Sequence, residues 1–180
     1  MNIKFQRCTE CIMDTSDPQI IFNEAGICNY CNHVKNYKYQ YTFTKEESKA
    51  NISKMADLIK SSPSPKGYDC VLGLSGGVDS SYLALMAKEM GLNPLCVHFD
   101  NGWNSEAAVA NINKIVKHCN YELFTVVINW EEFRDLQRSF LQAGVVDLEM
   151  LSDHAIFASL FKLRRQYNIK YVLSGTNFAT

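Results

Sequence analysis

The sequence contains no long hydrophobic run, few prolines and no excess of charge of one sign. No segment reaches the roughly 18 to 20 consecutive apolar residues that a membrane-spanning helix needs, and residues 1–7 lack the apolar stretch of a secretory signal. These absences predict a soluble, cytoplasmic protein without a membrane partner. Lysine and arginine number 18 against 19 acidic residues, which disfavours a nucleic-acid partner because phosphate backbones select strongly basic surfaces.

Seven cysteines in a chain without a secretory signal indicate thiols or metal ligands, not a disulfide framework. The length of 180 residues suits one mid-sized domain with a small appendage. Two of the four prolines fall within residues 60–67, together with a glycine and three serines, which is typical of a linker. We therefore predict a small N-terminal domain over residues 1–44, a helix and linker over 45–66, and a larger domain over 67–180.

Beyond the linker, apolar segments of strand length alternate with segments of helical periodicity. Strands are expected at residues 69–74, 94–99, 123–128 and 170–173. Helices are expected at residues 78–90, 106–118 and 153–166, besides the helix that begins near residue 45. This alternation predicts an α/β fold with a doubly wound parallel sheet, because right-handed crossovers place helices on both faces of the sheet.

Four cysteines form two pairs near the start of the chain, Cys8-x-x-Cys11 and Cys28-x-x-Cys31, with sixteen residues between the pairs. Each Cys-x-x-Cys turn can direct two sulfurs at one ion, and four thiolates suit tetrahedral zinc. A site with four cysteine ligands leaves no position for water, so the zinc would be structural, in a zinc-ribbon-like domain. An iron–sulfur cluster and two incidental cysteine pairs are the alternatives.

A glycine-rich segment joins the first expected strand of the larger domain to the helix that follows. It reads Leu-Ser-Gly-Gly-Val-Asp-Ser-Ser at 74–81, and it lacks the lysine of the ordinary P-loop. Gly76 and Gly77 permit close approach of a phosphate to the backbone, and the helix N-terminus offers free N–H groups. Ser75 and Ser80 can donate hydroxyl hydrogen bonds, so the segment favours phosphate binding.

Asp79 lies within this phosphate-binding segment and would repel a phosphate directly. We therefore predict that it holds magnesium, directly or through water, against nucleotide phosphates. A plain strand–turn–helix, in which the serines and Asp79 only cap the helix, is the alternative.

The sequence Ser-Gly-Gly-Val-Asp-Ser after a strand resembles the loop of the pyrophosphatase-loop superfamily, which includes GMP synthetase, NAD synthetase, asparagine synthetase and tRNA-thiolating enzymes. The resemblance implies an enzyme that splits ATP to AMP and pyrophosphate. It implies catalytic roles for Ser75, Asp79 and Ser80. It also implies nucleotide contacts from the whole loop: Ser75, Gly76, Gly77, Val78, Asp79 and Ser80.

The chain as a whole resembles the N-acetyl sugar amidotransferases. The motifs concerned are Cys-Thr-Glu-Cys-Ile-Met-Asp-Thr-Ser-Asp-Pro, Cys-Asn-Tyr-Cys, the glycine-rich loop, Val-His-Phe-Asp-Asn-Gly-Trp at 97–103, Ser-Asp-His-Ala at 152–155 and Ser-Gly-Thr-Asn-Phe-Ala at 174–179. The resemblance implies conversion of an acetamido sugar to an acetamidino sugar, in O-antigen lipopolysaccharide or in pseudaminic or legionaminic acid biosynthesis. Members of that family are longer, so the resemblance also implies that their C-terminal part is lacking here.

Residues after the second and fourth expected strands should lie beside the loop, because ligands of open parallel sheets bind at the carboxyl ends of strands. Asp100 follows the second strand, where it either contacts the nucleotide or forms an Asp-Asn-Gly turn. Gly175, Thr176 and Asn177 follow the fourth strand and are expected to bind the nucleotide.

Two histidines and an aspartate carry weaker functional signals. Asp153 is expected to be the N-cap of the last helix, and His154 is a hypothetical substrate or phosphate contact. His98, inside the second strand, is expected to be a core residue with its hydrogen bonds satisfied, not a general base.

No glutaminase is visible in the sequence. Residue 2 is Asn2, not the cysteine that one glutaminase type needs after Met1, and Gly26-Ile-Cys28-Asn-Tyr30 lacks the last glycine of the Gly-x-Cys-x-Gly elbow. If the reaction is amidation of an acetamido sugar, we therefore expect a separate glutaminase subunit that supplies ammonia, or direct use of ammonium.

The main rival function is tRNA thiolation. Residues 67–180 hold nine basic and twelve acidic residues, which leaves little positive surface for a polyanion. Cys70, Cys96 and Cys119 are expected to be buried hydrophobes, not reactive thiols. The alternation Tyr37, Tyr39, Tyr41, Phe43 predicts an edge strand or arm, with base stacking as its alternative. A non-catalytic module that only binds nucleotide or a partner is a third possibility.

Overall fold

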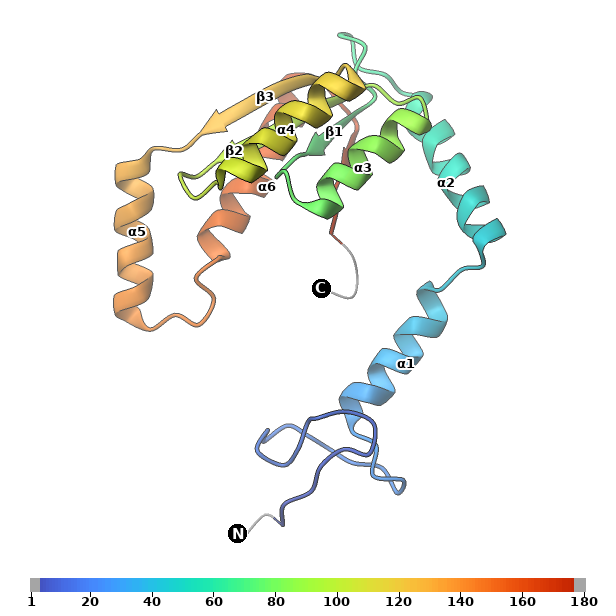
Figure 1. Ribbon diagram of the computed structural model, residues 1–180, viewed down its shortest axis with the longest axis vertical. Helices are drawn as coiled ribbons and strands as arrows, with labels where there is room; N and C mark the ends of the chain where they lie inside the picture. Colours follow the sequence, from blue (N-terminus) through green and yellow to red (C-terminus); the bar gives the residue numbers. More distant parts are fainter. Residues whose placement is uncertain (1–3, 177–180) are drawn as a thin grey trace. The chain divides into compact units, whose positions relative to one another are not determined.

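The computed structural model describes residues 4–176, with the backbone alone at residues 38–41 (Figure 1). The chain divides into two compact units, Met1–Ala50 and Asn51–Thr180. The division falls inside helix α2 (Lys45–Lys60). Within the described residues, no helix is both long and apolar enough to cross a membrane.

The second unit is built on four parallel strands, as the alternating pattern predicts. The strands are β1 (Cys70–Gly73), β2 (Pro94–Asp100), β3 (Glu122–Val127) and β4 (Tyr171–Leu173), in the order β3-β2-β1-β4. The chain runs outward from β1 to β3 and then returns to pair β4 with the other side of β1. The order therefore reverses between β1 and β4, and such a switch point is where open α/β sheets bind ligands.

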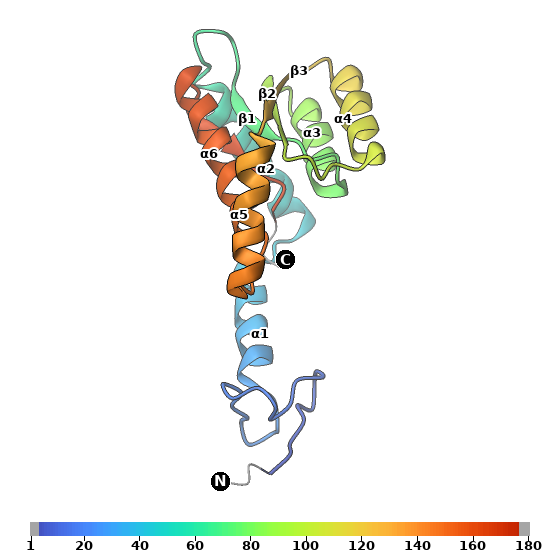
Figure 2. The same cartoon turned by 90° about the vertical axis from the view of Figure 1, so that its left-hand side faces the viewer.

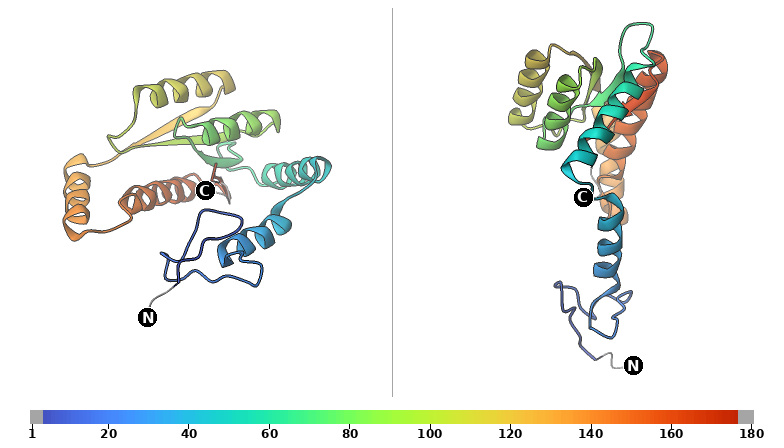
Figure 3. Two further views of the ribbon diagram at one scale, coloured as in Figure 1. Left: turned by 60° about the horizontal axis from the view of Figure 1, so that its bottom comes forward. Right: turned by 90° about the vertical axis from the view of Figure 1, so that its right-hand side faces the viewer.

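Helices cover both faces of this sheet, which confirms the doubly wound architecture. The helices are α3 (Val78–Glu89), α4 (Glu106–Cys119), α5 (Trp130–Ala143) and α6 (Met150–Gln166). Helices α3 and α4 lie on one side of the strands and α6 lies on the other (Figure 2), and the same layers are seen in Figure 3.

The alternation of side chains along β1 explains the two layers of core. Cys70 and Leu72 are fully buried in a cluster with residues of α3 and α4, whereas Val71 is buried in a second cluster with residues of α6. Side chains of a strand alternate between the two faces of a sheet. Because both faces of β1 are covered, its sequence is continuously apolar.

The predicted arm at the tyrosine alternation is wrong. Helix α1 (Asn29–Tyr41) begins inside the second Cys-x-x-Cys pair and runs through most of that segment. The rings of His33 and Tyr37 lie 5.5 Å apart, as expected for residues four apart on one helix face. Polar residues separate the tyrosines, so a strand and an exposed helix are equally compatible with the pattern.

The start of α6 also differs from the expectation. The helix begins at Met150 with Glu149 as its N-cap residue, so Asp153 lies in the first turn and is not the N-cap. Helix α5 occupies the connection between β3 and α6.

Candidate functional site

The glycine-rich segment 74–81, which we call the phosphate loop, leads from β1 into α3. It requires glycine at position 76. Gly76 has a φ of +78°, and a Cβ there would lie 2.3 Å from the backbone oxygen of Ala108 in α4. The side-chain amide of Asn111 donates a hydrogen bond of 3.1 Å to the Gly76 oxygen. The loop is therefore held tightly against α4, in a conformation that disfavours any other residue.

The hydroxyls of Ser75 and Ser80 lie across the loop from one another. Their oxygens are 3.0 Å apart, and the Ser75 backbone N–H donates to Ser80 Oγ over 3.2 Å. The N-cap residue of α3 is Gly77, which provides no side-chain cap. The first-turn N–H groups of α3 can therefore be offered to a phosphate oxygen.

The segment after β4 passes close to the first turn of α3. A Cβ on Gly175 would lie 3.1 Å from the backbone nitrogen of Ser80, so the two backbones are nearly in contact. Thr176 follows directly, and its backbone N–H donates to Ser174 Oγ. The ends of β1 and β4 thus meet at the switch point, as the sheet order requires.

A cavity of about 440 Å³ lies at this edge of the sheet, and we call it the nucleotide cavity. It is lined by Gly73, Leu74, Ser75, Asp79, Ser80, Val97, His98, Phe99, Asn101, Asn104, Asp153, Ile156, Phe157, Leu160, Leu173, Ser174, Gly175 and Thr176. Five predicted site residues are therefore brought together here: Ser75, Asp79, Ser80, Gly175 and Thr176. Gly76, Gly77 and Val78 form the loop without lining the cavity, and Asn177 lies outside the described residues.

Asp100 does not line the nucleotide cavity. Its Oδ1 accepts hydrogen bonds from the Gly102 N–H over 3.0 Å and from the Asn104 side chain over 2.9 Å. These bonds form the turn that was the alternative interpretation of this residue. The turn directs Asn101 and Asn104 into the cavity instead.

The two histidines have different surroundings. His98 is buried and its Nδ1 lies 3.1 Å from the Leu74 oxygen, as expected for a core residue, but it also lines the nucleotide cavity. His154 lines a different cavity, and its Nδ1 lies 2.9 Å from the Met150 oxygen. The structure thus gives His154 no place in the nucleotide cavity.

Sequence reasoning missed the contribution of α6 to this cavity. Asp153, Ile156 and Phe157 of α6 line the cavity together with residues of the phosphate loop. The spacing of these three residues, at i, i+3 and i+4, could have indicated one helix face. Only the fold shows that this face covers the ends of the strands.

The charged groups that line the nucleotide cavity within residues 4–176 are the carboxylates of Asp79 and Asp153, without lysine or arginine. Carboxylates alone would repel a triphosphate. Magnesium bound by one or two carboxylates and by phosphate oxygens reverses that repulsion. The lining therefore fits a magnesium–nucleotide complex better than a free polyphosphate.

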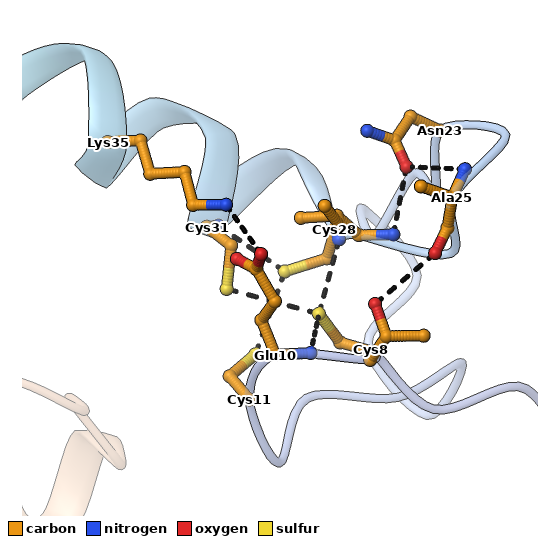
Figure 4. Close-up of polar contacts among 10 residues, drawn as sticks. Cys8, Glu10, Cys11, Asn23, Ala25, Cys28, Cys31 and Lys35 are labelled. Atoms are coloured by element: carbon orange, nitrogen blue, oxygen red, sulfur yellow. Dashed lines mark hydrogen bonds and ion pairs between the residues drawn. The ribbon is translucent and has the colours of Figure 1, made fainter.

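The four paired cysteines of the first unit converge on one point (Figure 4). Their sulfurs all lie within 4.8 Å of one another, with 3.9 Å between Cys8 and Cys31 and 3.7 Å between Cys11 and Cys28. For zinc–sulfur bonds of about 2.3 Å, a tetrahedron has sulfur–sulfur edges of about 3.8 Å. The four sulfurs could therefore hold one zinc ion, whereas a polynuclear cluster would separate them by its own width.

Backbone N–H groups donate to two of these sulfurs and favour the thiolate of Cys8, whereas a hydrogen bond with Cys11 and burial raise the pKa of Cys31 to about 12. Cys8 Sγ accepts from the N–H groups of Glu10 and Cys28, and Cys28 Sγ accepts from the N–H of Cys31. Burial raises the pKa of Cys8, but the surrounding N–H donors outweigh it and bring this pKa to about 6. The thiolate form is the one that binds metal.

The remaining cysteines are buried, as predicted. Burial raises the pKa of Cys70 and of Cys96 to about 12, and it also raises the pKa of Cys119. Thiols of this kind are poor nucleophiles because the thiolate is the reactive form.

A doubly wound sheet with a serine- and glycine-rich loop at its switch point defines a nucleotide-binding domain of the pyrophosphatase-loop class. The sequence model of the asparagine synthase family matches residues 69–176, which is more than half of the chain. The chain belongs to this family.

Individual relatives are more distant. An uncharacterized protein of Methanocaldococcus jannaschii is 28% identical over 172 residues, which cover 94% of this chain and 58% of that protein. The solved NH3-dependent NAD synthetase from Campylobacter jejuni is 22% identical, with a TM-score of 0.52 over 71% of this chain and 56% of that one. The NMN synthetase from Francisella tularensis is 21% identical, with a TM-score of 0.52 over 72% and 54%. The chain thus spans between half and three-fifths of the length of these proteins, and the two structures share its fold.

Proposed function

We propose that this protein is an ATP-dependent, carbon–nitrogen bond-forming enzyme that converts an acetamido group of a sugar into an acetamidino group. The observation that supports it best is the nucleotide cavity, in which the phosphate loop, two carboxylates and the β4 turn meet at the switch point. Membership of the asparagine synthase family supports the ATP-dependent part. The sugar substrate is proposed from the resemblance of the whole chain to the N-acetyl sugar amidotransferases, and the pathway is that of a surface polysaccharide or glycan.

The proposed reaction has two steps. The acetamido oxygen attacks the α-phosphorus of ATP, a C–O–P linkage forms, and pyrophosphate leaves. Ammonia then attacks the activated carbon, the carbon–oxygen bond breaks, and AMP leaves with that oxygen. The products are the amidinium, AMP, pyrophosphate and one proton. Adenylation is needed because an amide oxygen is a poor leaving group.

The residues of the cavity supply positioning and charge neutralisation, so no covalent nucleophile is required. The first-turn N–H groups of α3 and the hydroxyls of Ser75 and Ser80 would bind phosphate oxygens. Asp79, together with Asp153, would hold magnesium, which would neutralise the phosphate charge when bound. Ile156 and Phe157 give the cavity an apolar wall suited to the adenine ring.

We further propose that a separate glutaminase subunit supplies the ammonia. The sequence has neither a cysteine directly after Met1 nor a Gly-x-Cys-x-Gly elbow.

The four paired cysteines of the first unit would hold a structural zinc ion, since four cysteine ligands leave no position for water.

The experiment that tests the activity combines the protein with magnesium ATP, ammonium and a panel of acetamido sugars. AMP and pyrophosphate are followed, and the sugar is weighed by mass spectrometry. Replacement of one oxygen by NH in a sugar, with equimolar AMP, is the expected result. A parallel arm contains bulk tRNA and a sulfur donor, and AMP formation confined to that arm would contradict the proposal in favour of thiolation.

Asp79→Asn tests the role of the loop carboxylate in this assay. We expect AMP formation to fall about 100-fold or more, because an amide cannot neutralise or bind magnesium as a carboxylate does. Asp147→Asn is the control, since Asp147 is exposed and lies outside the cavities described here. Equal activity of both variants would show that Asp79 does not hold the metal.

A further inference from the structure

A second cavity of about 290 Å³ adjoins the nucleotide cavity, and we call it the Trp103 pocket. It is lined by Asn101, Trp103, Gln137, Leu141, Leu148, Glu149 and Ser152. Asn101 lines both cavities, and Ser152 of the pocket is followed in α6 by Asp153 of the nucleotide cavity. A ligand in the pocket is therefore directly beside the groups that would hold the nucleotide.

Trp103 is fixed in place although its side chain remains largely exposed. Its indole Nε1 donates to Gln137 Oε1 over 3.1 Å, and its ring packs edge to face on Trp130 with a centroid distance of 5.7 Å. A Cβ on Gly102 would lie 3.0 Å from the Trp130 ring, so a glycine before Trp103 gives the second ring its space. Even so, Trp103 is 66% exposed. An oriented aromatic face open to solvent is suited to stacking against a ligand.

The polar groups around this ring select the chemistry of the ligand. Gln137 and Ser152 offer amide and hydroxyl groups, Glu149 offers a carboxylate, and Leu141 and Leu148 give an apolar wall. Among the described residues, neither lysine nor arginine lines this pocket, so they offer an anionic phosphate no cationic partner. A ring with one apolar face and several hydroxyls matches this combination, and the volume suits one monosaccharide.

Asn101 is placed to guide the reacting group from one cavity to the other. Its Oδ1 accepts from the Trp103 backbone N–H over 3.1 Å, and its Nδ2 donates to Ser152 Oγ over 3.5 Å. Because Ser152 is buried, the amide of Asn101 is tied to the body of α6. An acetamido arm extending past Asn101 would enter the nucleotide cavity.

We propose that the Trp103 pocket binds the sugar ring of the acceptor, with the ring stacked on Trp103 and its acetamido group directed past Asn101 to the nucleotide. This assignment rests on the function proposed above and identifies the residues that would choose the sugar. Trp103 and Gln137 are the side chains on which recognition depends most.

Binding is measured separately from turnover. The full chain is saturated with magnesium and α,β-methylene-ATP, which cannot release pyrophosphate, and is titrated calorimetrically with N-acetylglucosamine, UDP-N-acetylglucosamine and glucosamine. Saturation-transfer NMR shows which sugar protons touch the protein. We expect at least one acetylated sugar to bind, with its ring protons receiving saturation, and glucosamine to bind more weakly because it lacks the acetyl group.

The variants are Trp103→Ala, Trp103→Phe and Gln137→Ala. Trp103→Ala should weaken sugar binding about tenfold or more, Trp103→Phe should retain part of it through the remaining ring, and Gln137→Ala should weaken it about threefold to tenfold. Affinity for the nucleotide analogue should stay unchanged. Phe161→Ala is the control, because Phe161 is 54% exposed on α6 and lies outside the cavities described here. Gln137→Ala and Trp103→Phe keep the test decisive if Trp103→Ala does not fold.

The possible results distinguish failure of the proposed sugar pocket from failure of the proposed function. Sugar affinity that is unchanged in Trp103→Ala, Trp103→Phe and Gln137→Ala would overturn the pocket and leave the proposed function standing, because the sugar would bind elsewhere. Failure of every acetylated sugar to bind the wild type, with the nucleotide analogue bound, would overturn both. If bulk tRNA binds the wild type and this binding is lost in Trp103→Ala, the ligand of the Trp103 pocket would be a nucleic acid and not a sugar.

Discussion

At the scale of single residues, the phosphate loop depends on backbone geometry that its glycines permit. Gly76 combines a positive φ with a position at which a Cβ would lie only 2.3 Å from the backbone oxygen of Ala108. Gly144, which ends α5, has a similar φ of +66°, but nothing lies within 4 Å of the position of a Cβ. Substitutions at these two positions therefore distinguish the cost of left-handed backbone strain from the cost of a steric clash.

Gly76→Ala should be much more damaging than Gly144→Ala. Both variants incur the left-handed strain of about 1 to 2 kcal/mol, and overpacking adds about 1 to 3 kcal/mol at position 76. The free energy of unfolding, obtained from urea titration, measures the difference, and affinity for an ATP analogue should fall only in Gly76→Ala. Equal losses of stability would mean that α4 moves away from the loop at little cost.

At the scale of elements, the first unit is organised by its cysteine pairs. The first pair lies on an irregular bend, and the second pair spans the start of α1, which begins at Asn29. Ahead of α1, this unit has no helix or strand within residues 4–28 apart from short bridges such as Phe22 with Cys28. A metal ion would therefore contribute a large part of its folding free energy.

Cys31→Ser tests this dependence. We expect the wild type to carry one zinc ion per chain by mass spectrometry of metals, and the variant to lose it because three thiolates leave the tetrahedron incomplete. Limited proteolysis should then cleave the first fifty residues and spare the sheet. Cys119→Ala is the matched control and should keep its zinc. Full zinc content in Cys31→Ser would show that the ion is held elsewhere. Iron in place of zinc in the wild type would show that the four cysteines hold iron.

Elements buried on both sides could be predicted from the sequence, whereas elements defined by their surroundings could not. The apolar run of β1 and the alternation of strands and helices predict the parallel sheet with helices on both faces. The Cys-x-x-Cys spacing predicts that the four sulfurs lie together. The helix through Tyr37 is not predicted, because tyrosines that alternate with polar residues fit an edge strand as well as an exposed helix. Asp153 is not the N-cap, because α6 starts one turn earlier, at a place without a strong capping residue.

The candidate site was only partly predictable for a related reason. Loop residues such as Ser75 are close in sequence to the strand and helix that position them, so the motif alone places them. The α6 wall of the cavity and the Trp103 pocket form only when distant segments pack together. Asp100 shows the limit most clearly, since a strand-end aspartate can face the ligand or form the turn, and here it forms the turn.

At the scale of the whole molecule, the balance of charge favours a small neutral acceptor over a polyanion. Residues 67–180 carry nine basic and twelve acidic side chains, and the lining of both cavities is acidic or neutral. A nucleic acid would meet little of the cationic surface from which phosphate binding draws its affinity. In the proposed reaction the nucleophile is uncharged as well, because ammonia attacks through its lone pair.

The source of that ammonia can be identified from the dependence of the rate on pH. With an ammonium salt as the nitrogen source, AMP formation at fixed total ammonium should rise with pH between 7 and 8.5, by up to about tenfold per unit, because only the unprotonated form attacks. Addition of glutamine to the chain alone should give no turnover. With the partner glutaminase present, glutamine should support the reaction and the rise should flatten, since ammonia would be delivered unprotonated. Full glutamine-dependent activity from this chain alone would contradict the need for a partner.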